Sequence, residues 1–279
     1  MRRLARGSGA ALLALSLLGP RTAAAEELEH RSGGRFALEL GGAAALTVGS
    51  LLLPLPEECR WCSPPGIDLF LHSPWPDSGR DEVAFVSHAL AFGVLPLGAI
   101  GTAVLLPLAH DEPDRHALEN LAIVSEAIML NLALTITVKK LVARRRPAYF
   151  YGRGDVCEFG AKSEEKNLSF FSGDSSVAFT LASAASTLSF LRGYPEAPFV
   201  LAAGGVLAGT AAAMRVASDV HWPTDVLTGS LVGTAVGVLV PLLLHPREET
   251  ESASVSRASL GVRSGSPASR FGFGYSGAF

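Results

Sequence analysis

Six long apolar segments follow one another along this chain and are separated by polar loops. They run over residues 36–55, 83–108, 117–138, 175–191, 198–214 and 226–244. Most approach the length of about 20 residues that a helix needs to cross the hydrocarbon core of a bilayer. The pattern therefore predicts an all-α fold, a multi-pass transmembrane bundle of about six helices.

The fourth and fifth segments are short and rich in Ala, Gly, Ser and Thr, which permits close packing between helices. Glu119 and Glu126 are seven residues apart and share one face of the third predicted helix. Charges within a membrane helix are expected to point into the bundle or to lie near a wet end. We expect these two to be packing groups without a catalytic role.

Composition agrees with a membrane protein. Hydrophobic residues make up 48% of the 279 positions and charged residues 18%, whereas a soluble domain usually carries about a quarter charged residues. The net charge is −3. Because no basic tract with interleaved aromatic residues is present, no nucleic-acid partner is expected.

The N-terminus has the pattern of an export signal. Arg2, Arg3 and Arg6 precede a short apolar core over residues 10–18, and small residues follow at 23–25. A signal peptide over 1–25 is predicted in preference to an uncleaved membrane helix, because the core is too short to span. The remaining divisions are 26–115, N-terminal membrane helices with an interfacial loop; 116–245, a catalytic core; and 246–279, a polar Gly/Ser-rich tail.

Cysteine spacing gives little support for a metal. Cys59 and Cys62 form a C-x2-C pair, and Cys157 lies alone. No second pair and no His pair completes a zinc site, so neither a metal nor another cofactor is expected. In an exported protein the pair can form a local disulfide; two free thiols in a tight loop are the alternative, and both stay open.

Three polar segments at the ends of the apolar runs carry the residue types that phosphoryl transfer uses. They are Lys139-x6-Arg146-Pro147, Phe171-Ser172-Gly173-Asp174 and Arg215-x5-His221-x3-Asp225. Together they offer cations and donors for phosphate oxygens, a nucleophile, and a carboxylate to orient it. Ser172 and Gly173 open the fourth helix, where free backbone N–H groups and the helix dipole favour an anion.

In their order and spacing these motifs resemble those of the type 2 phosphatidic acid phosphatase family, whose superfamily also includes vanadium haloperoxidases. The resemblance covers about residues 117–244. The family's K-x6-R-P, P-S-G-H and S-R-x5-H-x3-D motifs are matched at Lys139, Arg146, Pro147, Ser172, Gly173, Arg215, His221 and Asp225. The departures are Phe171 for proline, Asp174 for histidine and Met214 for serine.

The resemblance implies an acid phosphatase-like phosphoric monoester hydrolase that acts on a lipid phosphate or diphosphate. His221 would attack phosphorus and form a phosphohistidine, and Asp225 would hold its other ring nitrogen. The phosphate would be bound by Lys139, Arg146, Ser172, Gly173 and Arg215. A haloperoxidase is disfavoured, because those enzymes are soluble and this chain has membrane helices; membrane lipids are the expected surroundings and substrate source.

Asp174 stands where the family has the histidine that protonates the leaving alkoxide, a step worth about 10² to 10⁴ in rate. An Asp with an ordinary pKa of about 3.9 is ionised at neutral pH and cannot donate. Burial or the phosphate could raise that pKa, or Asp174 could simply cap the fourth helix. Weak activity is expected, and the alternative is an impaired member of the fold that binds lipid phosphate.

The side of the membrane is predicted in two ways that disagree. Counting helices from an exported N-terminus puts the loop after residue 138 in the cytoplasm, and the eight Lys and Arg residues from 139 to 166 agree with the positive-inside rule. The resemblance to bacterial phosphatases instead implies a multi-pass inner (cytoplasmic) membrane protein with a periplasmic site. We favour the periplasm.

Overall fold

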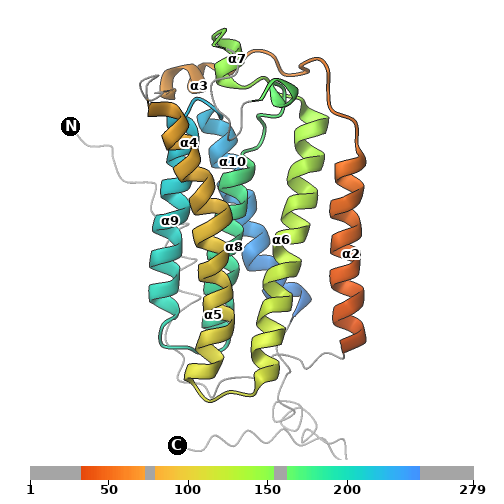
Figure 1. Cartoon of the computed structure of the whole chain (residues 1–279), viewed down its shortest axis with the longest axis vertical. Coiled ribbons are helices and arrows are strands. Elements are labelled where there is room, and N and C mark those ends of the chain that lie inside the picture. The colour runs from red at the N-terminus through yellow and green to blue at the C-terminus, as the bar shows by residue number, and fades with distance from the viewer. Residues whose placement is uncertain (1–32, 73–78, 154–161, 246–279) are drawn as a thin grey trace, which may run out of the picture. The chain divides into compact units, whose positions relative to one another are not determined.

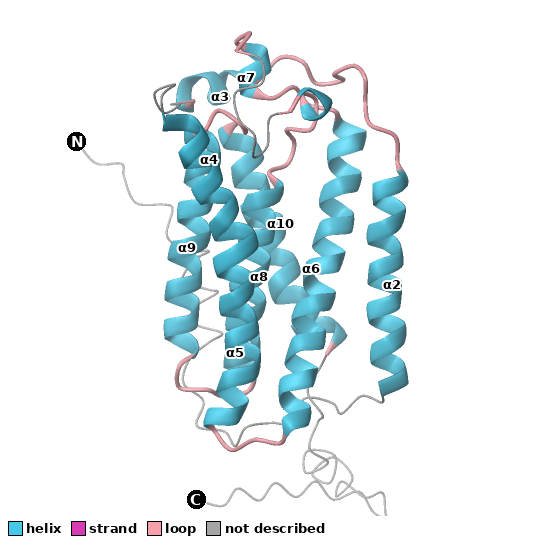
Figure 2. Ribbon diagram, in the orientation of Figure 1, coloured by secondary structure: helices cyan, strands magenta, loops and turns pink. Residues whose placement is uncertain are grey.

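The computed structural model describes residues 33–72, 79–153 and 162–245, and its regular elements there are all helical (Figures 1 and 2). The long helices are α2 (Gly33–Leu52), α4 (Arg80–Ala89) continued by the π-helical turn η2 (Leu90–Val94) and α5 (Leu95–Ala109), α6 (Asp114–Val142), α8 (Gly173–Leu191), α9 (Ala197–Ala217), and α10 (Pro223–Leu239) continued by η4 (Val240–Leu244). Short helices α3 (Gly66–Leu71), α7 (Pro147–Phe150) and η3 (Ser163–Glu165) lie in the loops. All six predicted helices are confirmed. The predicted signal peptide, Cys157 and the C-terminal tail lie outside the described residues.

Five of these helices are long and apolar enough to cross a membrane: 33–52, 80–109, 114–142, 197–217 and 223–244. The chain is a multi-pass membrane protein. The predicted fourth helix, α8, is not among the five. It lies in the centre of the bundle, where it packs against α5, α6, α9 and α10 (Figure 2). A helix enclosed by other helices has little contact with lipid, so its serine content carries no penalty of the kind a lipid-facing helix would incur.

Helices α8 and α10 approach each other through a stripe of glycines on α10. A Cβ atom on Gly229 would lie 2.5 Å from the carbonyl oxygen of Ser172, and one on Gly233 would lie 2.2 Å from that of Ser176. Small residues at helix contacts let two backbones come this close in a membrane. The contact sets the start of α10 beside the start of α8, and the Ser172 N–H donates to the carbonyl oxygen of Asp225 at 3.0 Å.

One end of the bundle collects the helix termini that carry the predicted motifs. In Figure 1, helices α4, α8 and α10 begin at this end, and α6 and α9 end there, next to the short helices α3 and α7. Helix α2 begins at the opposite end. Three passes of the chain, α2, α4–α5 and α6, therefore separate the start of α2 from this end.

The two glutamates of α6 are buried within the bundle, one of the two arrangements expected for them. Glu119 accepts a hydrogen bond from Arg192 at 2.8 Å, and Glu126 lies 2.8 Å from Nε2 of His245. Each carboxylate is thus paired with a basic side chain inside the bundle, which is how a membrane protein tolerates such charges.

Candidate active site

His221 lies buried in the turn between α9 and α10, with Asp225 one helical turn further on. Its Nδ1 is 3.7 Å from Oδ2 of Asp225. Asp225 also caps the start of α10, because its carboxylate accepts from the backbone N–H of Trp222 at 3.0 Å. The hydroxyl of Ser169 donates to the same oxygen at 2.5 Å. These hydrogen bonds hold the carboxylate of Asp225 in place beside the imidazole of His221.

The other ring nitrogen of His221 faces Arg146. Nη1 of Arg146 lies 3.3 Å from Nε2 of His221 and donates to the carbonyl oxygen of Val220 at 3.2 Å. The rest of the guanidinium is bound by Glu165, through its carbonyl oxygen at 2.9 Å and its carboxylate at 3.1 Å. A fixed cation thus stands beside the nitrogen that Asp225 leaves available.

The surroundings of His221 keep its imidazole neutral. Burial, followed by the charges of Lys139, Arg146 and Arg215, lowers the pKa of His221 well below its ordinary value. A neutral imidazole has a lone pair on one nitrogen at neutral pH, which a nucleophile requires.

The start of α8 lies next to two more of the predicted phosphate-binding residues. Ser172 is the N-cap of this helix, and its side chain accepts from the backbone N–H of Ser175. A Cβ atom on Gly173 would lie 3.5 Å from Cε of Lys139. The ammonium of Lys139 in turn donates to the carbonyl oxygen of Leu168 at 2.8 Å. The structure therefore brings Lys139 to the N-terminus of α8, where an anion is favoured.

Asp174 lies in the first turn of α8 and is not its cap, since Ser172 fills that position. Interpreting Asp174 as a helix cap is therefore wrong. Its Oδ2 lies 3.4 Å from Nη1 of Arg215 and 3.2 Å from Nδ1 of His88. Arg215 thus belongs to the same cluster as Asp174, and His88 of α4 adjoins it.

Two residues of this region, Asp68 and Arg144, belong to none of the three sequence motifs. The guanidinium of Arg144 donates to both Asp225 and Asp68 and lies 3.9 Å above the ring of Trp61. Asp68 also accepts from the backbone N–H and the hydroxyl of Thr224, at 2.8 and 2.7 Å. All of Asp68 and nearly all of Arg144 is buried. They form a supporting layer that holds Asp225.

The loop of Cys59 and Cys62 packs against the segment that carries Arg146. The two cysteines form a disulfide, with their Cα atoms 5.3 Å apart. The backbone N–H of Arg60 donates to Ala143 at 3.0 Å, and that of Arg145 donates to Trp61 at 3.1 Å. The disulfide therefore lies at the same end of the bundle as His221.

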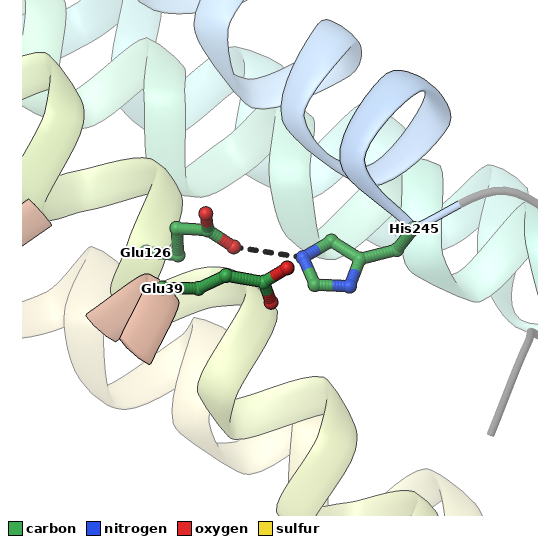
Figure 3. Close-up of side chains that lie close together, drawn as sticks. All are labelled: Glu39, Glu126 and His245. Atoms are coloured by element: carbon green, nitrogen blue, oxygen red, sulfur yellow. Dashed lines mark hydrogen bonds and ion pairs between the residues drawn. The ribbon is translucent and has the colours of Figure 1, made fainter. Parts of the chain in front are cut away.

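Within the described residues, one group of side chains has the types and spacing of metal ligands: Glu39, Glu126 and His245, whose ligand atoms lie within 4.8 Å of one another (Figure 3). His245 follows η4, at the end of the α10 segment opposite to His221. Nε2 of His245 lies 2.8 Å from the carboxylate of Glu126, and Glu39 forms an ion pair with Arg35 at 3.2 Å. This cluster has no part in the His221 site.

Fold and site together define a multi-pass membrane protein with a buried histidine–carboxylate pair among clustered cations at one end of its bundle. Residues 120–249 match the model of the PAP2 superfamily. The resemblance seen in the motifs is thereby confirmed.

Among solved structures, the chain is similar to the crystal structure of the first transmembrane PAP2 type phosphatidylglycerolphosphate phosphatase from Bacillus subtilis. The identity is 18%, the match covers 74% of this chain and 90% of that one, and the TM-score is 0.41. A likeness this distant carries no argument about substrate. A search of curated protein sequences found no relative of this chain.

Proposed function

We propose that this protein is a membrane phosphatase that hydrolyses a lipid phosphate or diphosphate ester through a phosphohistidine at His221. One observation carries the proposal: the imidazole of His221 lies between Asp225 on Nδ1 and Arg146 on Nε2. The imidazole thus has a carboxylate within ion-pair distance on one side and a cation that can bind phosphate on the other, an arrangement that suits covalent phosphoryl transfer.

In the proposed reaction, Nε2 of His221 forms a bond to phosphorus as the bond to the leaving oxygen breaks. Asp225 steadies the positive charge that develops on the ring. Arg146, Arg215 and Lys139 bind the non-bridging oxygens, with help from the hydroxyl of Ser172 and the N–H of Gly173. Water then attacks the phosphohistidine and releases inorganic phosphate, which restores His221.

The position of the site supports a lipid as substrate. His221, Arg146 and Arg215 lie where membrane helices end, the depth at which a lipid presents its headgroup. Phosphatidate, an isoprenyl diphosphate, phosphatidylglycerol phosphate and a lipid A phosphate share the chemistry that this cluster recognises. A phosphate ester of a membrane lipid is therefore the proposed substrate class.

The alternative is a protein that binds lipid phosphate and turns it over slowly or not at all. The contact between Asp174 and Arg215 favours it, because a carboxylate on that guanidinium competes with a phosphate for the same charge. A carboxylate is also a poor proton donor at neutral pH.

Phosphate release from a panel of these four lipids by purified protein separates the two hypotheses. The proposal expects release from at least one lipid, its abolition by His221→Ala, and an acid-labile phosphoprotein formed by the unchanged chain. Release that survives in a folded His221→Ala preparation contradicts the mechanism. Saturable binding of a lipid phosphate with no release from any lipid favours the binding protein.

We further propose that the site faces the oxidising side of an inner-type membrane. A disulfide persists in oxidising compartments, and the Cys59–Cys62 bond lies beside the site. Because three passes separate the site from the start of α2, that start then lies on the cytoplasmic side. Cleavage of a signal peptide after residue 25 would instead leave the start of α2 on the exported side, so a periplasmic site and a cleaved signal over residues 1–25 exclude each other.

A further inference from the structure

We propose that His88, held by Asp174, donates the proton to the leaving group in this reaction. The proposal rests on the phosphatase function proposed above. In this chain Asp174 replaces the family's histidine, so protonation of the leaving group needs another proton donor. The observation that starts it is the contact of 3.2 Å between Nδ1 of His88 and Oδ2 of Asp174.

His88 is held at the edge of the cation cluster by the packing of α4 on α9. The hydroxyl of Ser87 donates to the carbonyl oxygen of Ala211 at 2.9 Å, and Nη1 of Arg215 lies 3.5 Å from the carbonyl oxygen of Ala84. Ala84 and His88 are four residues apart, so they lie on the same face of α4. The face that meets Arg215 therefore also presents the imidazole.

The ring of His88 is both oriented and accessible. Its side chain is 43% exposed, against 1% for that of His221. The ring of Phe92 packs on it at a centroid distance of 4.6 Å, and Asp174 holds Nδ1. A leaving oxygen can approach such a side chain, and the ring nitrogen turned away from Asp174, Nε2, is the one that would transfer a proton.

Histidine suits this step because its proton exchanges near neutral pH. As the bond from phosphorus to the alkoxide breaks, the proton on Nε2 of His88 moves to that oxygen, and the alcohol departs. The neutral ring then accepts a proton from the water that attacks the phosphohistidine. Phosphate leaves, and both histidines return to their starting states with one water consumed. Asp174 is a positioning residue here and His88 the catalytic one.

The test compares two substrates that differ in how much their leaving group needs a proton. An alkyl phosphate needs general acid catalysis, whereas p-nitrophenolate leaves without protonation. His88→Gln should slow release of phosphate from the alkyl ester by about 10² to 10⁴, and from p-nitrophenyl phosphate by less than about tenfold. Because the ratio is taken within one preparation, any partial loss of folded protein cancels.

His110→Gln is the matched control. His110 forms a similar pair, with Glu196 at 3.1 Å, and its side chain is 33% exposed, but it follows α5 at the opposite end of the bundle. It should leave the ratio of the two rates unchanged. Asp174→Asn should shift that ratio in the same direction as His88→Gln, by a smaller factor.

Several outcomes overturn the proposal. An equal effect of His88→Gln on both substrates, or no effect on either, removes His88 as the proton donor. If only Asp174→Asn loses activity selectively on the alkyl ester, Asp174 is the proton donor. If Asp174→Asn releases phosphate faster from both substrates, Asp174 only competes with phosphate for Arg215. Failure of the phosphatase function itself is recognised separately, since then the unchanged chain releases no phosphate that depends on His221.

Discussion

The close contact between α8 and α10 predicts that one added methyl group, far from the reacting atoms, will damage both stability and activity. The substitution is Gly233→Ala. Its Cβ atom would lie 2.2 Å from the carbonyl oxygen of Ser176 and 2.9 Å from the carbonyl carbon. Ordinary contact begins near 3.4 Å, so the two helices must move apart by about 1 Å. Neither neighbour can relax cheaply, because both atoms belong to the backbone of a buried helix.

The cost follows from this displacement. Overfilling a well-packed interior typically costs about 1–3 kcal/mol of stability. The same movement pulls on the hydrogen bond of 3.0 Å between Ser172 and Asp225, which joins the start of α8 to the start of α10. A shift of about 1 Å in a catalytic group can reduce the rate about 10²-fold. Gly233→Ala is therefore expected to lower the melting temperature and to reduce turnover.

Thermal unfolding in detergent and phosphate release, measured on the same preparation, check both effects. Gly209→Ala is the control, since Gly209 lies inside α9 and a Cβ atom there would meet nothing within 4 Å. It should melt and turn over like the unchanged chain. If Gly233→Ala behaves like Gly209→Ala in both measurements, the argument from close helix packing is refuted.

Three further predictions concern the surroundings of the site. Asp68→Asn weakens the buried ion pair with Arg144, which keeps its other carboxylate partner, Asp225. The free energy of unfolding, measured with denaturant, should therefore fall by about 3 kcal/mol, the lower end for breaking such a pair. An unchanged free energy of unfolding would contradict this. The pKa of His221 is lowered on folding, so the unfolded chain takes up a proton before the folded one does as the pH drops. Stability should therefore fall below about pH 6.5, by up to about 1.4 kcal/mol per pH unit. The decrease in melting temperature between pH 7.5 and pH 5 should be smaller in His221→Gln than in the unchanged chain. Cys59 and Cys62 should react with a thiol reagent that cannot cross the membrane only after reduction, and labelling without reduction would contradict the disulfide.

The helices could be predicted from the sequence because each long apolar run has to span or fill a bundle. The predicted limits differ from the observed ones mainly where polar residues extend a helix beyond its apolar part. The apolar run over residues 117–138 predicts a helix that ends at residue 138, yet α6 continues through Lys139 and Lys140 to Val142. Lysine is a good helix former, and the ammonium of Lys140 reaches the carbonyl oxygens that end α2.

The supporting residues could not be predicted, since their role depends on contacts between distant segments. Arg144 stands in a run of three arginines, and the motif spacing selects only Arg146. Asp68 accepts hydrogen bonds from Thr224, which follows 156 residues later, and it lies in a loop expected only to follow the membrane surface. Nothing local distinguishes either one. Their importance appears only when α3 is seen to pack on the start of α10.

The same limit applies to the substitution at position 174, which considered within its motif suggests a damaged enzyme. A carboxylate there takes up part of the charge of Arg215 and supplies no proton at neutral pH. The contact with His88 changes both consequences. A proton on Nδ1 of His88 would face Asp174 and leave more of the charge of Arg215 for phosphate, and the proton on Nε2 would be the one that passes to the leaving group, as proposed above. A lone histidine in an apolar helix gives no such signal in the sequence, so the chemistry of position 174 has to be judged from the pair that it forms.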